Sequence, residues 1–205
     1  MGIFLATNFH QWTLLFSKAA PGSWSLYVSS RIGKKGALVA VDLLDLDNRT
    51  LAKMKNKKNG APFYTVKGDF TSEVVKKRIL QILLSRVTEE DGQIPLKINC
   101  VISDMAANFT GDQLTDALRT INLCEEALMF AAGSTCFDNA PDADDASLLS
   151  RGGTFLCKFF TCGQKYEEDL MNAAARSFEY TSIIKPNASR KKSAEMYLFA
   201  TGFKK

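Results

Sequence analysis

Residues 98–104 read INCVISD, an apolar run that ends on a carboxylate. The short length of the run and its β-branched residues predict a buried strand with Asp104 at its carboxyl end. Two further runs have the same form: GTFLCK closes on Lys158, and EMYLFAT opens on Glu195. If these runs are strands of one sheet, three distant charges meet along one edge. A lysine between two carboxylates there favours proton chemistry, and the alternative is three unrelated charges.

Strand-like and helix-like patterns alternate along the whole chain. Apolar runs typical of strands lie at residues 11–17, 37–41, 62–66, 97–103, 154–158, 180–184 and 195–201. Helical patterns lie at residues 24–32, 71–87, 112–132 and 166–176. Repeated strand–helix–strand units predict an α/β, Rossmann-like fold, with a mostly parallel sheet and helices on both faces. We expect a lysine-rich loop with a helical turn before Gly60 and an acidic surface loop at residues 133–150.

The helical pattern at residues 71–87 allows a more detailed prediction. Thr71 is expected to cap the helix, because its side chain can accept a hydrogen bond from the first turn. Apolar residues at helical spacing define the face expected to be buried. These residues are Val74, Val75, Ile79, Ile82 and Leu83.

The composition limits the classes of function. A chain of 205 residues, of which 46% are hydrophobic, fits a single domain over residues 1–205. No apolar run reaches the roughly 18 residues that span a bilayer, and we expect no secretory signal. Five cysteines without a C-x-x-C pair and a single histidine predict buried, reduced thiols and no metal site.

The net charge of +4 is modest, but the basic residues are clustered. One cluster lies at residues 53–58, a second at residues 185–192, and two lysines end the chain. Each cluster fits either a solvated loop or a patch that faces RNA. The second cluster directly precedes Glu195, so it bears most on the predicted site.

A nucleoside site is predicted at the carboxyl ends of the first three strands. Gly22 lies in the first turn and allows the backbone to approach a ligand closely. Asp42 ends the second strand, where a carboxylate can accept both hydroxyls of a ribose. Asp69 follows the third strand and could bind an adenine amino group. The turn is not a G-x-G-x-x-G, so an adenosine-bearing cofactor other than a nicotinamide is favoured.

Three segments of the chain resemble one known family, the FtsJ-like (RrmJ-like) ribosomal RNA 2′-O-methyltransferases. Residues 103–111, SDMAANFTG, resemble the family's S-D-M-A-P-N-x-[ST]-G, with Ala107 in place of proline. Residues 152–160, GGTFLCKFF, are similar to G-G-x-F-[LV]-x-K-x-[FY]. Residues 185–202 are similar to K-P-x-[AS]-S-R…E-x-Y…T-G. The resemblance covers about residues 12–205, and the mitochondrial large-subunit rRNA uridine 2′-O-methyltransferases are the branch it favours.

The resemblance implies a Rossmann-like fold that uses S-adenosylmethionine (SAM) to methylate a ribose 2′-hydroxyl, here a uridine of large-subunit ribosomal RNA. It implies a Lys-Asp-Lys-Glu catalytic set in which Asp104, Lys158 and Glu195 take the last three places. Lys158 would accept the proton. The donor-binding positions would be Gly22, Trp24, Asp42, Asp69 and Asp104. The implied partner is ribosomal RNA or the pre-ribosomal large subunit, and we expect a monomer in the mitochondrion, with cytoplasm or nucleus as alternatives.

The sequence departs from the family's pattern near its beginning. Nothing before Trp12 matches the helix that carries the family's first catalytic lysine. In the first strand, Phe16 replaces an acid and Lys18 replaces a glycine. Either the enzyme is impaired or the sequence has a truncated N-terminus. Two other functions therefore stay open, a non-catalytic RNA-binding ribosome assembly factor and a tRNA 2′-O-methyltransferase.

Overall fold

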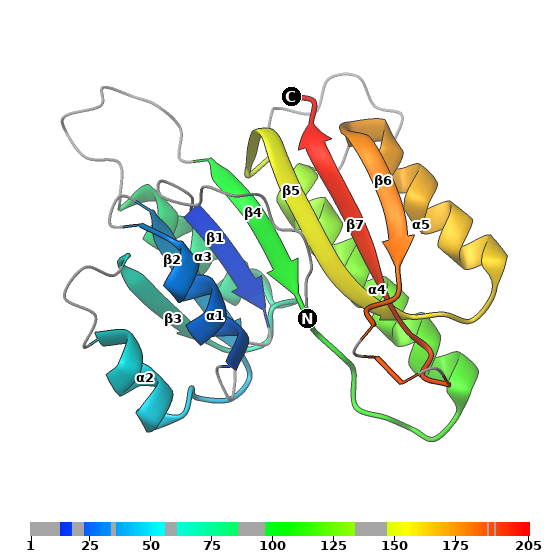
Figure 1. Ribbon diagram of the computed structural model, residues 1–205, viewed down its shortest axis with the longest axis horizontal. Coiled ribbons are helices and arrows are strands. Elements are labelled where there is room, and N and C mark those ends of the chain that lie inside the picture. Colours follow the sequence, from blue (N-terminus) through cyan, green and yellow to red (C-terminus); the bar gives the residue numbers. More distant parts are fainter. Residues whose placement is uncertain are drawn as a thin grey trace. The chain divides into compact units, whose positions relative to one another are not determined.

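The computed structural model describes residues 13–17, 23–33, 36–55, 61–85, 97–133, 147–187, 189–190 and 192–205. These residues form two compact units, which divide between Ile98 and Asn99. We call them the N-terminal unit and the C-terminal unit and describe each by itself (Figure 1).

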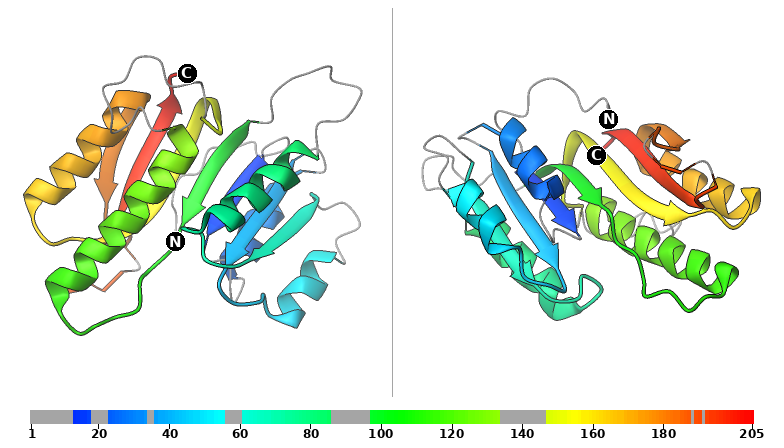
Figure 2. Two further views of the ribbon diagram at one scale, coloured as in Figure 1. Left: turned by 180° about the vertical axis from the view of Figure 1, so that it is seen from behind. Right: turned by 60° about the horizontal axis from the view of Figure 1, so that its bottom comes forward.

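The described part of the N-terminal unit is a parallel sheet with helices on both of its faces. Its strands are β1 (Thr13–Ser17), β2 (Ala37–Asp42) and β3 (Phe63–Lys67), and β2 pairs in parallel with both neighbours. The helices are α1 (Ser23–Arg31), α2 (Asn48–Lys55) and α3 (Glu73–Leu84). Figures 1 and 2 show α1 and α3 on opposite faces of these strands.

The C-terminal unit is a mixed sheet in the strand order β4-β5-β7-β6. The strands are β4 (Ile98–Ser103), β5 (Leu149–Phe160), β6 (Phe178–Ile184) and β7 (Glu195–Phe203). The helices α4 (Gln113–Ala132) and α5 (Gln164–Ser177) cover one face of it (Figure 2). Strand β7 runs antiparallel to both β5 and β6. This reversal was not predicted from the sequence; it arises because β6 and β7 follow one another without a helix between them.

The core of each unit consists of apolar side chains from the central strands and the inner faces of the helices. In the N-terminal unit, every residue of β2 except Asp42 is buried. In the C-terminal unit, residues 153–159 of β5 are all buried, and this strand lies in the interior of the sheet between β4 and β7. Helix α4 buries a stripe from Ala117 to Ala132, and its N-cap Asp112 accepts a hydrogen bond from the Thr115 N–H at 2.8 Å.

The predicted cap and buried face of α3 are partly wrong. The N-cap is Ser72, which makes no side-chain capping bond, and Thr71 instead donates its hydroxyl to Asp69. Asp69 accepts a hydrogen bond from the backbone of this turn, and the helix is capped one residue later than expected. Val74 is 75% exposed, because the buried stripe follows Val75, Ile79 and Leu83.

Two segments were predicted as loops from composition. In the lysine-rich stretch the expected helical turn is the two-turn helix α2, whose buried Thr50 and Met54 are one turn apart. Of the acidic segment 133–150, residues 134–146 lie outside the described part of the chain. Strand β5 begins at Leu149 rather than Thr154, and the two glycines before Thr154 lie inside the strand.

Three of the cysteines agree with the predicted burial. Cys100, Cys124 and Cys157 are buried free thiols, Cys162 is half-buried, and Cys136 lies outside the described residues. Burial raises the pKa of Cys100 to about 12. Within the described residues no cluster of histidine, cysteine or acidic side chains has the arrangement of a metal site. The described helices include none that is both long and apolar enough to cross a membrane.

Candidate active site

The predicted charges come from three neighbouring strands of the C-terminal unit. Asp104 follows the last residue of β4, Lys158 lies near the end of β5, and Glu195 begins β7. The antiparallel register of β5 and β7 places Lys158 directly beside Tyr197. Side chains alternate between the faces of a strand, so Glu195 and Tyr197 lie on the same face as Lys158.

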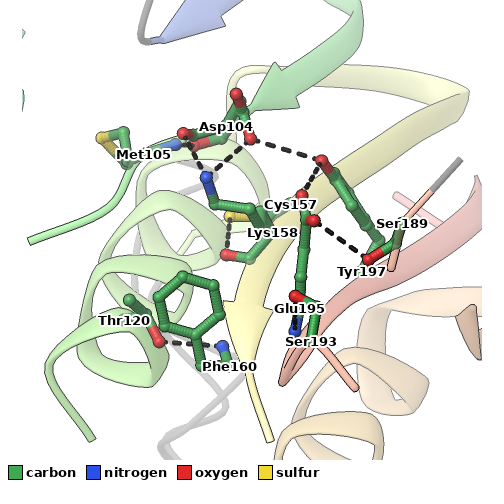
Figure 3. A network of polar contacts seen from close by, with 11 residues as sticks. Asp104, Met105, Thr120, Cys157, Lys158, Phe160, Ser189, Ser193, Glu195 and Tyr197 are labelled. Carbon is green, nitrogen blue, oxygen red and sulfur yellow. Dashed lines mark hydrogen bonds and ion pairs between the residues drawn. The ribbon is translucent and has the colours of Figure 1, made fainter. Parts of the chain in front are cut away.

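Lys158 and Asp104 form the centre of the site (Figure 3). The Lys158 ammonium lies 2.8 Å from the Asp104 Oδ1 and also donates to the Asp104 backbone carbonyl at 3.0 Å. The Lys158 side chain is 8% exposed and the Asp104 side chain 22%. A lysine that is this buried requires a charged or polar partner, and Asp104 supplies two acceptors. The pair is therefore fixed in position and still reachable from solvent on the carboxylate side.

Glu195 joins this pair through a tyrosine rather than directly. The Tyr197 hydroxyl lies 3.3 Å from the Asp104 Oδ1 and 3.0 Å from the Glu195 Oε1. Among the described residues, the ion pair of Lys158 is with Asp104 and not with Glu195. The expectation that three charges meet is confirmed, but the lysine is not held between the two carboxylates.

The loop between β6 and β7 fixes the other side of Glu195. The Ser189 hydroxyl donates to the Glu195 Oε2 at 3.1 Å, and the Glu195 N–H donates to the Ser193 hydroxyl at 3.2 Å. Both carboxylate oxygens thus have a hydroxyl donor. Figure 3 shows the continuous path of contacts from Ser189 to Lys158.

Tyr197 is the site residue that was not predicted from the sequence. Burial, followed by the charges of Asp104 and Glu195, raises the pKa of the Tyr197 hydroxyl above its ordinary value. The hydroxyl therefore stays neutral, and its single O–H can donate a hydrogen bond to Asp104 or to Glu195. Two signals could have identified it: its place in the E-x-Y segment, and its position two residues after Glu195 on the same strand face.

The N-terminal unit brings two of the predicted donor-binding residues to one sheet edge. Asp42 ends β2, and its backbone carbonyl accepts a hydrogen bond from the Gly68 N–H at 2.9 Å, so Asp69 follows at the same edge. The Asp42 Oδ1 accepts from the Leu44 N–H, and the Asp69 Oδ1 accepts from the Thr71 N–H, which orients both carboxylates.

The surroundings of these two carboxylates suit an adenosine. Leu43 and Leu44 are 65% and 69% exposed beside Asp42, and exposed apolar side chains next to a carboxylate can contact a base while the acid binds its ribose. Trp24 is half-buried in the first turn of α1, and Gly22 lies outside the described residues.

Solved structures show which fold this chain has. A crystal structure of a chain assigned as a ribosomal RNA methyltransferase from Plasmodium falciparum matches with a TM-score of 0.64 and 19% identity. The match covers 95% of this chain and 87% of that one. Other matching structures hold SAM or S-adenosylhomocysteine. The fold is therefore the Rossmann-like fold of SAM-dependent methyltransferases, which confirms the Rossmann-like fold that the alternating pattern predicted and the methyltransferase fold that the family resemblance implied.

Sequence comparison places the chain within this class. Residues 17–203 match the FtsJ-like methyltransferase family, and the chain belongs to that family. It is 37% identical over 186 residues to the ribosomal RNA large subunit methyltransferase E of Francisella philomiragia, covering 91% of this chain and 72% of the relative. It is 34% identical to the protein of the same name from Rhodopseudomonas palustris, of which it spans 64%.

Proposed function

We propose that this protein transfers the methyl group of SAM to a ribose 2′-hydroxyl, in uridine, of large-subunit ribosomal RNA. The observation that carries the proposal is the buried Lys158–Asp104 pair, whose partners extend through Tyr197 to Glu195. An RNA substrate is supported by the basic residues Lys185, Arg190 and Lys192, which are exposed in the β6–β7 loop that leads into Glu195.

The residues divide between two tasks in this reaction. Bound SAM supplies an electrophilic methyl group on a sulfonium. Asp42 would accept the ribose hydroxyls of its adenosine, and Asp69 would accept the adenine amino group. Lys158, once neutral, would take the proton of the RNA 2′-hydroxyl as the oxygen bonds to the methyl carbon and the carbon–sulfur bond breaks. Asp104 would hold the Lys158 side chain in line with the attacking oxygen.

Two variants of Lys158 test the proposed proton transfer. Lys158→Arg keeps the positive charge beside Asp104, but a guanidinium stays protonated in water and cannot accept the proton. Lys158→Ala removes both the charge and the base. We expect both variants to lose about a hundredfold or more of the methyl transfer rate while binding SAM as the wild type does. Normal methylation by Lys158→Arg would remove lysine from the proton-acceptor role.

Two measurements separate this proposal from its alternatives. Isothermal calorimetry with SAM tests the alternative that the protein is a non-catalytic assembly factor. That alternative predicts that the protein does not bind SAM even at high SAM concentration. Methylation assays on separate ribosomal and transfer RNA pools test for a tRNA enzyme. Transfer of labelled methyl groups to transfer RNA alone would replace the proposed substrate.

We further propose a mitochondrial location, which rests only on the resemblance to the mitochondrial branch. Fluorescence microscopy of the tagged full-length gene product in its own cells tests it. A signal confined to the cytoplasm or the nucleus would contradict the proposal.

A further inference from the structure

Phe109 is a large apolar side chain that the fold leaves 70% exposed. It lies in the β4–α4 loop, which we define as residues 104–112 and which begins at Asp104. The ring of Phe109 stacks on the ring of Phe160, with centroids 5.6 Å apart and an angle of 21° between the planes. One ring face is thus in contact with protein, while the side chain as a whole remains mostly exposed.

The exposed position of Phe109 is fixed by helix α4. The buried Asp116 carboxylate accepts hydrogen bonds from the Thr110 N–H and hydroxyl, both at 2.8 Å, and from the Gly111 N–H at 3.2 Å. These bonds fix the backbone directly after Phe109. The loop therefore holds the ring outward in a defined place instead of leaving it free to fold onto the surface.

The same helix fixes the partner ring. Thr120 lies one turn after Asp116 on α4, and its hydroxyl accepts a hydrogen bond from the Phe160 N–H at 2.9 Å. The Lys158 ammonium lies 5.8 Å from the centroid of the Phe160 ring (Figure 3). The Phe160 ring therefore lies near the ammonium of Lys158, the candidate proton acceptor, and also stacks on the Phe109 ring.

We propose that Phe109 is a stacking platform for an unpaired base of the RNA substrate. This inference rests on the proposed function, because the occupant follows from an RNA ribose reacting at Lys158. A flat, rigidly held aromatic face that continues a two-ring stack fits a nucleobase, since every base presents a π-face. The platform positions the base, and hence its nucleotide, relative to Lys158.

Paired RNA probes and Phe109 variants test this inference. Fluorescence anisotropy is measured with a labelled oligouridine and with an abasic ribose–phosphate chain of the same length, both with SAM present. The abasic chain keeps the phosphates, so the ratio of the two affinities isolates stacking from charge. We expect wild type to bind oligouridine about tenfold more tightly than the abasic chain. Phe109→Ala and Phe109→Leu should bring that ratio close to one, and Phe109→Trp should keep it.

Two readouts distinguish stacking from a structural effect of the substitution. Phe109→Leu retains an apolar contact with Phe160 but has no ring. A fall in its ratio of oligouridine affinity to abasic-chain affinity is therefore specific to the loss of stacking. Tyr180→Ala, which removes another exposed aromatic side chain on β6, should keep the wild-type ratio. Wild-type affinity for SAM in all variants confirms that they fold.

The outcomes separate failure of this inference from failure of the proposed function. If wild type binds and methylates RNA and Phe109→Ala shows the same affinity ratio, the platform is wrong and the proposed function stands. If wild type binds neither probe and methylates no RNA, the proposed function is wrong, and this inference, which rests on it, is wrong as well.

Discussion

At the scale of single residues, the Tyr197 hydroxyl links the two carboxylates of the candidate site. It has one hydrogen and lies within hydrogen-bonding distance of two carboxylates. Its raised pKa keeps that hydrogen on the oxygen. Tyr197 thus couples the orientation of Glu195 to that of Asp104, and we assign it a positioning role.

Replacing Tyr197 by phenylalanine tests this role. The ring and its packing remain, but the two carboxylates lose their shared donor, and each must then face the other without a hydrogen between them. We expect the turnover number to fall about tenfold, with the affinities for SAM and RNA unchanged. Radiolabelled methyl transfer under saturating conditions measures the effect. Tyr180→Phe, on the neighbouring strand, is the matched control, and an equal loss in that variant would contradict the assigned role.

The sequence was sufficient to predict that Asp104 and Lys158 lie close together, because each is a lone charge at the end of an apolar run. The sequence could not show whether Glu195 contacts Lys158 directly or through another side chain. Whether Glu195 contacts Lys158 or Tyr197 depends on the register of β5 and β7, which pairs Lys158 with Tyr197 and Phe160 with Glu195. That register is a long-range property that local patterns do not encode.

At the scale of elements, α4 organises the side of the site that lies beyond Asp104. Its first turns hold the β4–α4 loop through Asp116 and the end of β5 through Thr120. The hydrogen bonds from Thr110 and Gly111 hold the pKa of the Asp116 carboxyl below its ordinary value of 3.8. The folded state therefore favours the ionised carboxylate.

This shift predicts a pH dependence of stability. The contribution of Asp116 is complete at neutral pH and is lost as the pH falls below about 3.8 through the lower folded pKa, because the proton then competes with the loop donors. Asp116→Asn presents an amide donor to an N–H donor, so we expect a lower melting temperature at pH 7 and a smaller further loss on acidification. Thermal unfolding monitored by circular dichroism measures both effects.

Glu168→Gln, an exposed change on α5, serves as the control for Asp116→Asn. We expect it to keep the wild-type melting temperature at neutral pH. An Asp116→Asn variant with an unchanged melting temperature and an unchanged acid response would contradict the anchoring role of α4.

The elements themselves were largely predictable, and the exceptions have local causes. Long periodic segments such as α4 agree with the predicted bounds, since Asp112 caps the helix and Ala132 ends it. The start of β5 was placed too late because glycines ordinarily interrupt strands. Here Gly153 lies so close to the Ser150 carbonyl that a Cβ would come within 2.7 Å of it, so the strand itself requires a residue without a side chain.

At the scale of the whole molecule, we expect the proposed RNA binding to depend on charge as well as on the reacting residues. The exposed Lys185, Arg190 and Lys192 lie in the loop whose Ser189 contacts Glu195. Charges so placed would contact phosphates near the reacting ribose.

Replacing Lys185, Arg190 and Lys192 by alanine together tests this placement. Each lost phosphate contact lowers the salt dependence of single-strand binding by about 0.7, so the slope of log affinity against log salt should fall by roughly two. Replacing the exposed Lys77, Arg78 and Lys165 by alanine removes the same number of charges and should leave the slope unchanged. Equal slopes for both triple variants would show that the β6–β7 loop has no special part in binding.

Family membership could be predicted because three separate segments resemble the family's motifs, and the Rossmann-like fold could be predicted because strand and helix patterns alternate along the chain. The number of independently folding domains stays a prediction, as does the role of each catalytic residue.

The most direct test of the proposed function is the identity of the methylated product. Purified protein is incubated with deproteinised large-subunit ribosomal RNA and SAM that carries a deuterated methyl group, and the nucleosides are analysed by mass spectrometry. We predict deuterated 2′-O-methyluridine with wild type and, at equal reaction time, about a hundredfold less with Lys158→Arg. A label on a base, or equal labelling by wild type and Lys158→Arg, would contradict the proposed function.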